Sequence, residues 1–291
     1  MLVRDKRICL DSYSKNLVSN INIPQKTYNI VVSAGGLKGN YGTGVLSHLC
    51  HIYLKKKINI NKIYGASAGA VGGVAFLLCT EYPQLFNPTD AIDLHYINKR
   101  IYYEKKQKIT DSFMDEMYKR FPKDFYKKCS NKLYTTVSKI TSRGFERIVI
   151  NEYHSNEHLR DVVRASANVP FITTKNFFTK IYDDYYFDGI SPKIIDCDNF
   201  DYIYIDNMNV EYSSQKSIEP SDRCFESLVL KGIVDCHLMM QYNDCGGNVY
   251  INKMSNSSWL SYCLSYCWAI INFLIYIIGI TQIIKFFFWF L

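Results

Sequence analysis

The sequence lacks the features that mark secreted, repetitive or nucleotide-binding proteins. Its ten cysteines are scattered without a C-x-x-C pair, which is typical of a reduced, cytosolic protein. No period of about 20 to 50 residues repeats, which argues against a solenoid. Neither G-x-G-x-x-G nor G-x-x-x-x-G-K-[ST] is present, so a dinucleotide or nucleotide phosphate is a poor fit. The first seven residues carry charges where a signal peptide needs an apolar core.

The composition instead describes a globular and mildly basic protein. The chain has 291 residues, of which 48% are hydrophobic, and a formal net charge of +7. This length suits one α/β domain with an appendage. Basic residues concentrate between 99 and 132, interleaved with aromatic residues. The region is predicted to be either a solvated helical surface or a membrane-facing cap over the active site. No recognition motif for nucleic acid accompanies it.

A serine lies at the centre of the pentapeptide Gly65-Ala66-Ser67-Ala68-Gly69. This is the G-x-S-x-G pattern of a nucleophile elbow, in which a sharp turn between a strand and a helix exposes the serine. The glycines at 65 and 69 are expected because such a turn brings backbone segments too close for a Cβ atom. Residues 60–66 can supply the strand and residues 68–79 the helix. Ser67 is therefore a candidate nucleophile.

A second glycine-rich loop lies upstream of the serine. Residues 28–33 are rich in β-branched residues and predict a buried strand. This strand leads directly into a loop whose backbone N–H groups can point at one anion. Acyl transfer requires such donors, because its tetrahedral intermediate carries an oxyanion. The candidate oxyanion-hole residues are Gly35, Gly36, Leu37, Lys38 and Gly39.

A carboxylate follows at the end of an aromatic strand, in Tyr186-Phe187-Asp188-Gly189. A serine hydroxyl is a weak nucleophile and needs a base within hydrogen-bond reach. Asp188 can be that base without a histidine. His237 lies after Asp188 in the order of α/β-hydrolase triads, but its surroundings predict an apolar helix. His154 and His158 could share a helix face, but no third metal ligand accompanies them.

These elements, in this order, resemble those of the patatin-like phospholipase family. Over roughly residues 28–205, the matching segments are the loop 33–39 with Gly44-Val45-Leu46, the elbow 65–70, Ala165-Ser166-Ala167-Asn168-Val169-Pro170, and Phe187-Asp188-Gly189. The resemblance implies a three-layer α/β fold with a mostly parallel central sheet covered by helices. It implies Ser67 as nucleophile, Asp188 as the sole base, and the 35–39 loop as the oxyanion hole. It implies neither a metal nor a cofactor.

Two positions depart from the family pattern. Ala34 replaces the first glycine of the loop, which would weaken an oxyanion contact if that position needed a positive φ. Ile190 follows Asp188-Gly189 where the family usually has Gly or Ala. Because Ile190 lies beyond the carboxylate, its effect is expected to be smaller than that of Ala34.

The pattern of elements predicts an organised catalytic region with extensions on both sides. The expected parts are a loosely structured lead (1–27), the catalytic domain (28–205) with a helical insertion (84–132), and an extension (206–258). Further elements are expected as strands at 133–141, 145–150, 180–188 and 202–206, a loop at 209–222, and helices at 159–167 and 226–242. The alternation of strands and helices over 28–80 favours a parallel sheet.

The end of the sequence has a different character. Residues 260–284 carry no charge and, as a helix, would extend about 37 Å, which exceeds a bilayer core of about 30 Å. Aromatic residues gather at both ends of this segment, as in the interfacial belts of membrane helices. We expect a single-pass membrane anchor with the catalytic domain in the cytosol. An interfacial segment or a buried core helix are the alternatives.

The sequence thus predicts a membrane-anchored lipid acyl hydrolase of phospholipase A or lysophospholipase type. Its substrate would be a phospholipid or neutral lipid, cleaved through an acyl-enzyme by a Ser67–Asp188 dyad. The alternative is a membrane-anchored binding or scaffold protein with a degenerate patatin fold.

Overall fold

The computed structural model describes residues 2–94, 109–169, 173–174, 176–195, 198–210, 222–244 and 247–252. All of them belong to one compact unit, Met1–Lys253.

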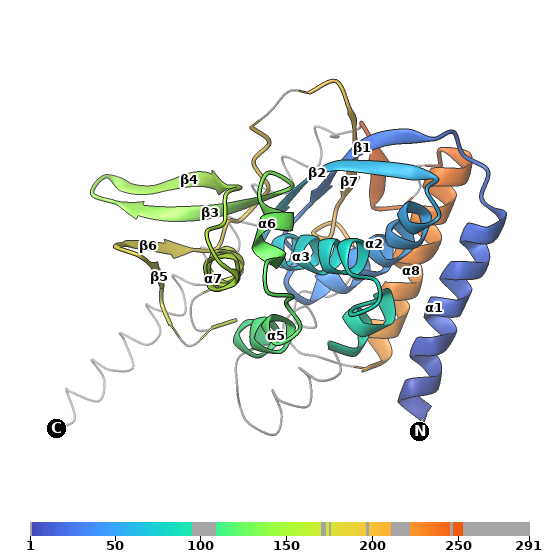
Figure 1. Cartoon of the computed structure of the whole chain (residues 1–291), viewed down its shortest axis with the longest axis horizontal. Coiled ribbons are helices and arrows are strands. Elements are labelled where there is room, and N and C mark those ends of the chain that lie inside the picture. Colours follow the sequence, from blue (N-terminus) through green and yellow to red (C-terminus); the bar gives the residue numbers. More distant parts are fainter. Residues whose placement is uncertain are drawn as a thin grey trace, which may run out of the picture. The chain divides into compact units, whose positions relative to one another are not determined.

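One mixed sheet of eight strands forms the framework of the described residues (Figure 1). Its centre is parallel and consists of β3 (Leu133–Thr141), β2 (Ile58–Ala66), β1 (Lys26–Val32) and β7 (Asp201–Ile205), in that order. Antiparallel strands extend it on both sides, namely β4 (Gly144–Ile150), β5 (Thr179–Ile181), β6 (Asp184–Phe187) and β8 (Val249–Ile251). The predicted mostly parallel α/β sheet is confirmed.

Helices precede, separate and follow these strands along the chain. They are α1 (Leu2–Asn20), the short 3₁₀ helix η1 (Gly36–Lys38), α2 (Gly39–Leu54), α3 (Ala68–Glu81), α5 (Ile109–Tyr118), α6 (Phe125–Cys129), α7 (Asn156–Ser166) and α8 (Asp222–Tyr242). Helix α3 consists largely of small and apolar residues, which lets it pack closely against β1, β2 and β3. Helix α7 begins with a capping bond, since the Ser155 hydroxyl accepts from the His158 amide.

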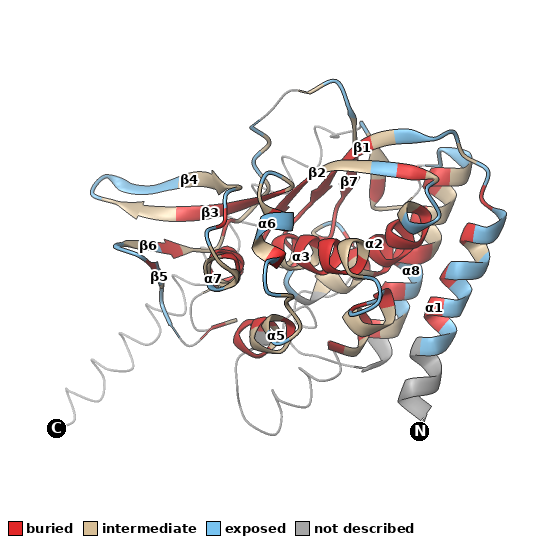
Figure 2. Ribbon diagram, viewed as in Figure 1, coloured by how far each residue is buried: buried red, intermediate tan, exposed pale blue. Residues whose placement is uncertain are grey.

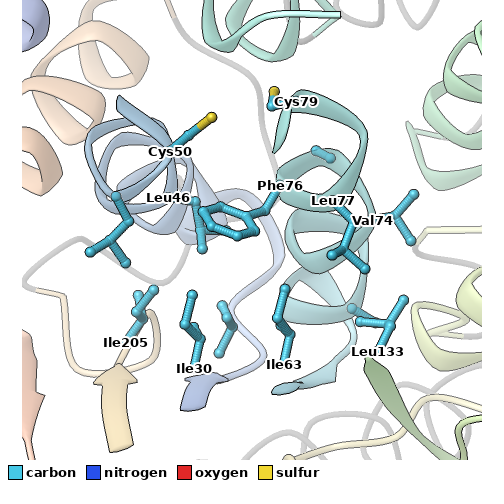
Figure 3. Packing of buried hydrophobic residues seen from close by; sticks show 14 of the residues in the cluster. Ile30, Leu46, Cys50, Ile63, Val74, Phe76, Leu77, Cys79, Leu133 and Ile205 are labelled. Atoms are coloured by element: carbon cyan, nitrogen blue, oxygen red, sulfur yellow. The ribbon is translucent and has the colours of Figure 1, made fainter. Parts of the chain in front are cut away.

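The main core lies between the sheet and the helices on one of its faces. Apolar side chains of β1, β2, β3 and β7 meet those of α2 and α3 there, as Figure 3 shows for Ile30, Ile63 and Leu133 beneath Leu46 and Phe76. Helix α7 packs against β3 on this same face. Burial of these side chains provides the main driving force for folding.

The opposite face of the sheet carries a separate layer of aromatic residues. Val31, Tyr64, Tyr134 and Tyr204 form this second cluster, and Ile194 is among the half-buried residues that pack on it. Among the described residues, no helix contributes to this cluster. In the described part of the chain, helices therefore cover one face of the sheet. The helical layer that the predicted three-layer fold places on the other face is not among the described residues.

The N-terminal segment differs from its prediction. Residues 2–20 form the helix α1, where the sequence pattern indicated a loosely structured lead. The buried Leu10 of α1 packs with apolar residues of α8, and the buried Val18 joins the main core, while polar side chains also attach the helix to α2. Asp11 pairs with His51 at 2.8 Å and Ser14 bonds His48 at 2.9 Å, all four residues being buried. Polar side chains at such buried positions interrupt the hydrophobic periodicity of the helix in the sequence.

The other predictions concern segments that the structure describes only in part. The predicted insertion 84–132 is helical where described, in α5 and α6, while residues 95–108 lie outside the described residues. The extension 206–258 supplies α8 and β8, and β8 pairs with β7. Most of the predicted loop 209–222 and all of the predicted membrane helix 260–284 lie outside the described residues. No described helix is long and apolar enough to cross a bilayer.

Candidate active site

Strand β3 brings the two candidate catalytic segments together. Its partner β4 runs along one edge from Thr135 to Thr141, so β2 and β6 both occupy the other edge. Strand β2 is parallel to β3 and ends at Ala66, which lies opposite Thr136. Strand β6 is antiparallel and ends at Phe187, opposite Ser138. The two strands thus approach each other end to end, and Ser67 and Asp188 both follow at the level of Val137.

Ser67 occupies a strained turn between β2 and α3. Its φ of 55° and ψ of −126° lie in a region that non-glycine residues rarely adopt. The side chain is buried, with 7% of the residue exposed. A Cβ atom on Gly69 would lie 2.1 Å from the Val32 carbonyl oxygen, and one on Gly65 would lie 2.8 Å from Ala70. Close packing therefore requires both glycines, as the nucleophile elbow predicts.

The Asp188 carboxylate is a poorly solvated neighbour of Ser67. Its Oδ1 accepts a hydrogen bond from the Ile190 amide at 2.7 Å, while Oδ2 is buried without a hydrogen bond of standard geometry. Burial raises the pKa of Asp188 to about 6, although the Ser67 hydroxyl and the Ile190 amide both act to lower it. The effect of the Ser67 hydroxyl on this pKa agrees with the strand register, which makes the two side chains neighbours without a standard hydrogen bond between them. Such loose contacts are common in unliganded catalytic sites.

The glycine loop 35–39 lies against the nucleophile elbow. A Cβ atom on Gly39 would lie 2.9 Å from the Cβ of Ala68, the residue after Ser67. Gly36 has a φ of 53° and begins η1, which continues directly into α2. The starts of α2 and α3 therefore lie side by side at Ser67.

Both helix starts carry amide groups that can bind an anion. The first N–H groups of a helix have no partner within it, and the helix dipole adds partial positive charge there. Neither Lys38, before α2, nor Ser67, before α3, makes a side-chain capping bond. The amides of Ala70 and Val71 already donate to the Ser67 carbonyl. Of the first amides of α3, those of Ala68 and Gly69 have no such bond, and the Ala68 amide, next to the loop, is a candidate oxyanion donor that the sequence analysis did not include.

The Lys38 ammonium group bonds within the protein and is not a free cation in the site. Its Nζ donates to the Met208 carbonyl at 3.2 Å. Burial lowers the pKa of Lys38, and the negative charge of Asp206 opposes this effect. Lys38 thus ties the loop to the segment after β7, so its contribution to the site is structural as well as electrostatic.

Ser166 connects the two catalytic segments, a role that the sequence analysis did not assign. Its hydroxyl accepts from the Ser67 amide at 2.9 Å and donates to the Thr136 carbonyl at 2.7 Å. Its carbonyl accepts from the Gly189 amide at 3.0 Å. One buried serine at the end of α7 therefore holds both turns against β3. The resemblance at residues 165–170 marked this segment, but only the fold shows the contact.

Asn207 supports the glycine loop in a similar way. Its backbone amide donates to the Ser33 hydroxyl at 2.8 Å, and its side-chain amide donates to the Ser33 carbonyl at 2.9 Å. Its Cβ lies where a side chain on Gly35 would have to fit, 2.6 Å from such a Cβ. The polar residues after β7 carried no recognisable sequence signal for this role.

The structure places His237 in a different environment from Ser67. His237 lies on α8, and its ring packs edge-on against His48 of α2, with ring centroids 5.5 Å apart. His48 is nine residues along α2 from Gly39, about 13 Å at 1.5 Å per residue. Burial lowers the pKa of His237. The rings of His154 and His158 stack on each other at 4.9 Å, and the described residues hold no group of three metal-ligating side chains.

The backbone conformation differs between the two departures from the family pattern. Ala34 is buried and does not have a positive φ, so its Cβ causes no backbone strain. Ile190 has a φ of 66°, which is unfavourable for a β-branched residue. The expectation that Ile190 affects the site less than Ala34 stays a prediction, but the backbone strain falls on Ile190 and not on Ala34. Gly189 itself is required by close approach, since its Cβ would lie 1.9 Å from the Thr136 carbonyl oxygen.

Comparison with known families agrees with this geometry. The family model described as patatin-like phospholipase matches residues 30–191, which is more than half of the chain. The chain belongs to the patatin-like phospholipase family. The matched residues include the glycine loop, the elbow and the aspartate turn, whereas α8 and β8 lie beyond them. A search of curated proteins finds no matching relative.

The patatin-like site combines three chemical elements at one end of β2. A strained serine lies beside a carboxylate whose pKa of about 6 lets it exchange a proton near neutral pH. Two helix starts offer backbone donors next to the serine. This arrangement can support nucleophilic attack on a carbonyl group without a metal ligand set.

Proposed function

We propose that the protein hydrolyses carboxylic ester bonds of lipids with Ser67 as nucleophile and Asp188 as the only base. The proposal rests mainly on one observation, the end-to-end approach of β2 and β6 along one edge of β3. That register leaves Ser67 and Asp188 as neighbours beside two uncapped helix starts. Family membership supplies the substrate class, because patatin-like phospholipases act on lipids.

In the proposed reaction, Asp188 accepts the Ser67 proton as the hydroxyl oxygen attacks the ester carbonyl. The negative charge that develops on the carbonyl oxygen is stabilised by the Ala68 amide and by amides of the 35–39 loop other than that of Lys38, which donates to the Gly35 carbonyl. Asp188 then donates the proton to the departing alcohol, which leaves an acyl group on Ser67. A water molecule gives a proton to Asp188 and attacks this acyl-enzyme. The fatty acid is released and the Ser67 hydroxyl is restored.

Ester hydrolysis by purified variants tests this function. Ser67→Ala should lower turnover by about 10³-fold or more, because no other hydroxyl can form the acyl-enzyme. His237→Ala is the matched control and should retain activity, since His237 packs on His48 rather than at the elbow. Full activity of Ser67→Ala would overturn the proposal. A wild-type protein that neither hydrolyses lipid esters nor reacts with serine-directed reagents would favour a binding or scaffold role.

We further propose that residues 260–284 anchor the protein to a membrane as a single-pass helix, with the catalytic domain in the cytosol. The absence of charge over 25 residues and the aromatic residues at both ends support this placement. Resistance of the full-length protein to carbonate extraction is the expected result. Complete release by carbonate would contradict the anchor without affecting the catalytic proposal.

A further inference from the structure

An exposed aromatic cluster lies next to the aspartate turn. The strand pairs β3–β4 and β5–β6 project beyond the end of β2 (Figure 1), and Figure 2 shows exposed residues along their outer parts. On these strands the Phe187 ring lies 5.5 Å from that of Phe145 and 6.5 Å from that of Phe178, centroid to centroid. Phe145 is 56% exposed and Phe178 is 38% exposed. Solvent exposure of adjacent phenylalanines is costly unless the surface has a partner.

Strand alternation shows which face carries these rings. Side chains alternate between the two faces of a sheet along each strand. Ile181 and Tyr186 belong to the main core under the helices, so Tyr185 and Phe187 point to the opposite face. The register places Phe145 and Lys180 on that face as well. This is the face whose aromatic layer no described helix covers. We call it the arm face, defined by Phe145, Phe178, Lys180, Tyr185 and Phe187.

The charge on and around the arm face is predominantly positive. Lys180 Nζ lies 6.0 Å from the ring centroid of Tyr185, and Arg147 projects from β4 to the Ser191 carbonyl at 2.5 Å. Two further cations are close by, Arg143 in the β3–β4 turn and Lys193, which donates to the Arg147 carbonyl. None of these four forms an ion pair with a described carboxylate.

The carboxylates of these strands lie elsewhere. Asp184 shares the opposite face with Lys139, and the two side chains pair at 2.7 Å. Glu146 is opposite Lys139 in the register and also belongs to that face. Asp183 is confined to the β5–β6 turn. The strand positions of the arm face therefore present aromatic rings and unpaired cations, which together complement an anionic interfacial layer.

We propose that the arm face docks the protein onto anionic phospholipid bilayers and thereby holds the enzyme at the surface that contains its substrate. Aromatic side chains partition into the interfacial region of a bilayer, and each nearby cation adds about 1 kcal/mol on an anionic surface. Phe187 immediately precedes Asp188, so a bilayer in contact with the arm face would lie beside the aspartate turn. By the same alternation, the Asp188 side chain lies on the opposite face, with that of Tyr186. Docking of this kind brings the proposed lipid hydrolase to its substrate, so its functional role rests on the proposed hydrolysis.

The basic helical region between 109 and 132 is a weaker candidate for this role. Its cations are largely neutralised by neighbouring acids, as in the pairs Lys119–Glu116 at 2.6 Å and Lys127–Asp124 at 3.3 Å. Lys128 and Lys132 both pair with Glu81. None of the four cations on and around the arm face forms an ion pair with a described carboxylate. Lys180 and Arg143 are the two of them for which the structure shows no hydrogen bond from the charged group to a described residue, whereas Arg147 and Lys193 donate to oxygen atoms of the protein.

Photo-crosslinking with lipid locates the docking surface directly. Full-length Ser67→Ala protein, which cannot turn over lipid, is mixed with vesicles of phosphatidylcholine containing about one third phosphatidylserine and a trace of diazirine-bearing phospholipid. After illumination, adducts are mapped by mass spectrometry. We expect adducts on peptides containing Phe145, Phe178 or Tyr185, at least fivefold fewer with vesicles of phosphatidylcholine alone. Adducts in 2–252 confined to other surfaces, such as 109–132, would overturn the proposal, as would equal labelling of neutral vesicles.

A matched pair of triple variants tests the consequence for catalysis. Phe145→Ser/Phe178→Ser/Tyr185→Ser should hydrolyse anionic vesicles at least tenfold more slowly than wild type, and a soluble short-chain ester within about twofold of the wild-type rate. The control replaces equally exposed apolar residues elsewhere, Leu85→Ser/Leu230→Ser/Tyr242→Ser, and should hydrolyse vesicles normally. Equal vesicle activity of both triple variants would overturn docking by the arm face. Wild-type activity in Ser67→Ala would instead overturn the catalytic proposal. Lipid adducts on the arm face in the photo-crosslinking experiment would then still show where the protein docks.

Discussion

The turn at Ser67 and the turn at Asp188 deliver their side chains to the same place by different means. At the elbow, the functional residue itself adopts the unfavourable backbone conformation, with a φ of 55°. At the aspartate turn, the unfavourable conformation falls two residues later, on Ile190 with a φ of 66°. Ser67 thus carries the strain at its own Cα and is held by the bond from its amide to Ser166, whereas Asp188 is held by the bond that Ile190 donates to its carboxylate.

The contacts explain the strained backbone at Ser67 but not the strained backbone at Ile190. Strain at Ser67 places the hydroxyl at the helix start of α3, which the proposed reaction requires. The side chain of Ile190 adds nothing to the carboxylate, because only its amide is used there. The two turns should therefore respond differently when the strain is removed.

Removal of the negative charge at the aspartate turn should have the largest effect. Asp188→Asn should lower ester turnover by about 10³-fold or more, since an amide cannot accept the serine proton. The same change should stabilise the fold at pH 8. The carboxyl has a pKa of about 6 when folded and about 3.9 when unfolded, so folding is opposed by up to about 3 kcal/mol once it ionises.

The sign of this effect can be checked by denaturant unfolding over a range of pH. A raised pKa means that the folded state binds the proton more tightly, so the contribution to stability is complete below about pH 4 and is lost as the pH rises through about 6. Asp188→Asn and wild type should therefore differ most at pH 8 and least at pH 4. A variant that is less stable than wild type at pH 8 would show that the carboxylate is better solvated than the site indicates.

At the elbow, the stability gained by relief of backbone strain should be separable from the activity lost with the nucleophile. Ser67→Gly and Ser67→Ala should both be inactive, but only the glycine variant should gain stability, by about 1 kcal/mol. Relief of a left-handed non-glycine residue is worth about 1–3 kcal/mol and the added chain entropy costs about 0.5–1 kcal/mol. Thermal and urea unfolding measure the difference. Equal stability of the two variants would mean that the turn is not strained.

The smallest effect is expected at the second turn. Ile190→Gly should raise the free energy of unfolding by no more than about 1 kcal/mol, because part of the strain relief is offset by chain entropy and lost packing. Ile190→Val keeps the β-branch and should give no gain. Hydrolysis should persist in both variants, since the amide bond to Asp188 is retained. A destabilisation of Ile190→Gly by more than about 2 kcal/mol would show that the isoleucine side chain supports the turn.

Local patterns in the sequence predicted much of this site and its framework. The strand 133–141 coincides with β3, and the predicted elbow and aspartate turn both flank it. These features have short-range causes, such as a glycine forced by close packing or a run of β-branched residues. The register of β6 along β3 has no such local signal, although it brings Asp188 to Ser67. The same is true of Ser166 and Asn207, whose roles depend on bonds to segments far away in the chain.

The segments that the sequence did not predict correctly are held by polar or long-range contacts. Helix α1 places Asp11 and Ser14 at buried positions, where they bond to α2, among apolar residues that pack on distant parts of the chain. Strand β8 has only three residues and exists because β7 offers it an edge. The backbone conformation of Ile190 depends on the closeness of Gly189 to Thr136 across the sheet. Each of these features appears only when distant parts of the chain are placed together.

The central claim, a Ser67 nucleophile activated by Asp188 alone, is tested most directly by the pH dependence of serine labelling. Wild type, Asp188→Asn and His237→Ala are treated with a fluorophosphonate, and the adduct is located and timed by mass spectrometry. The account predicts one adduct, on Ser67, formed about tenfold faster per pH unit up to about pH 6 and at a constant rate above pH 7. Labelling should be slow at every pH in Asp188→Asn and unchanged in His237→Ala. An adduct on another residue, or Ser67 labelling that survives Asp188→Asn and is lost in His237→Ala, would contradict it.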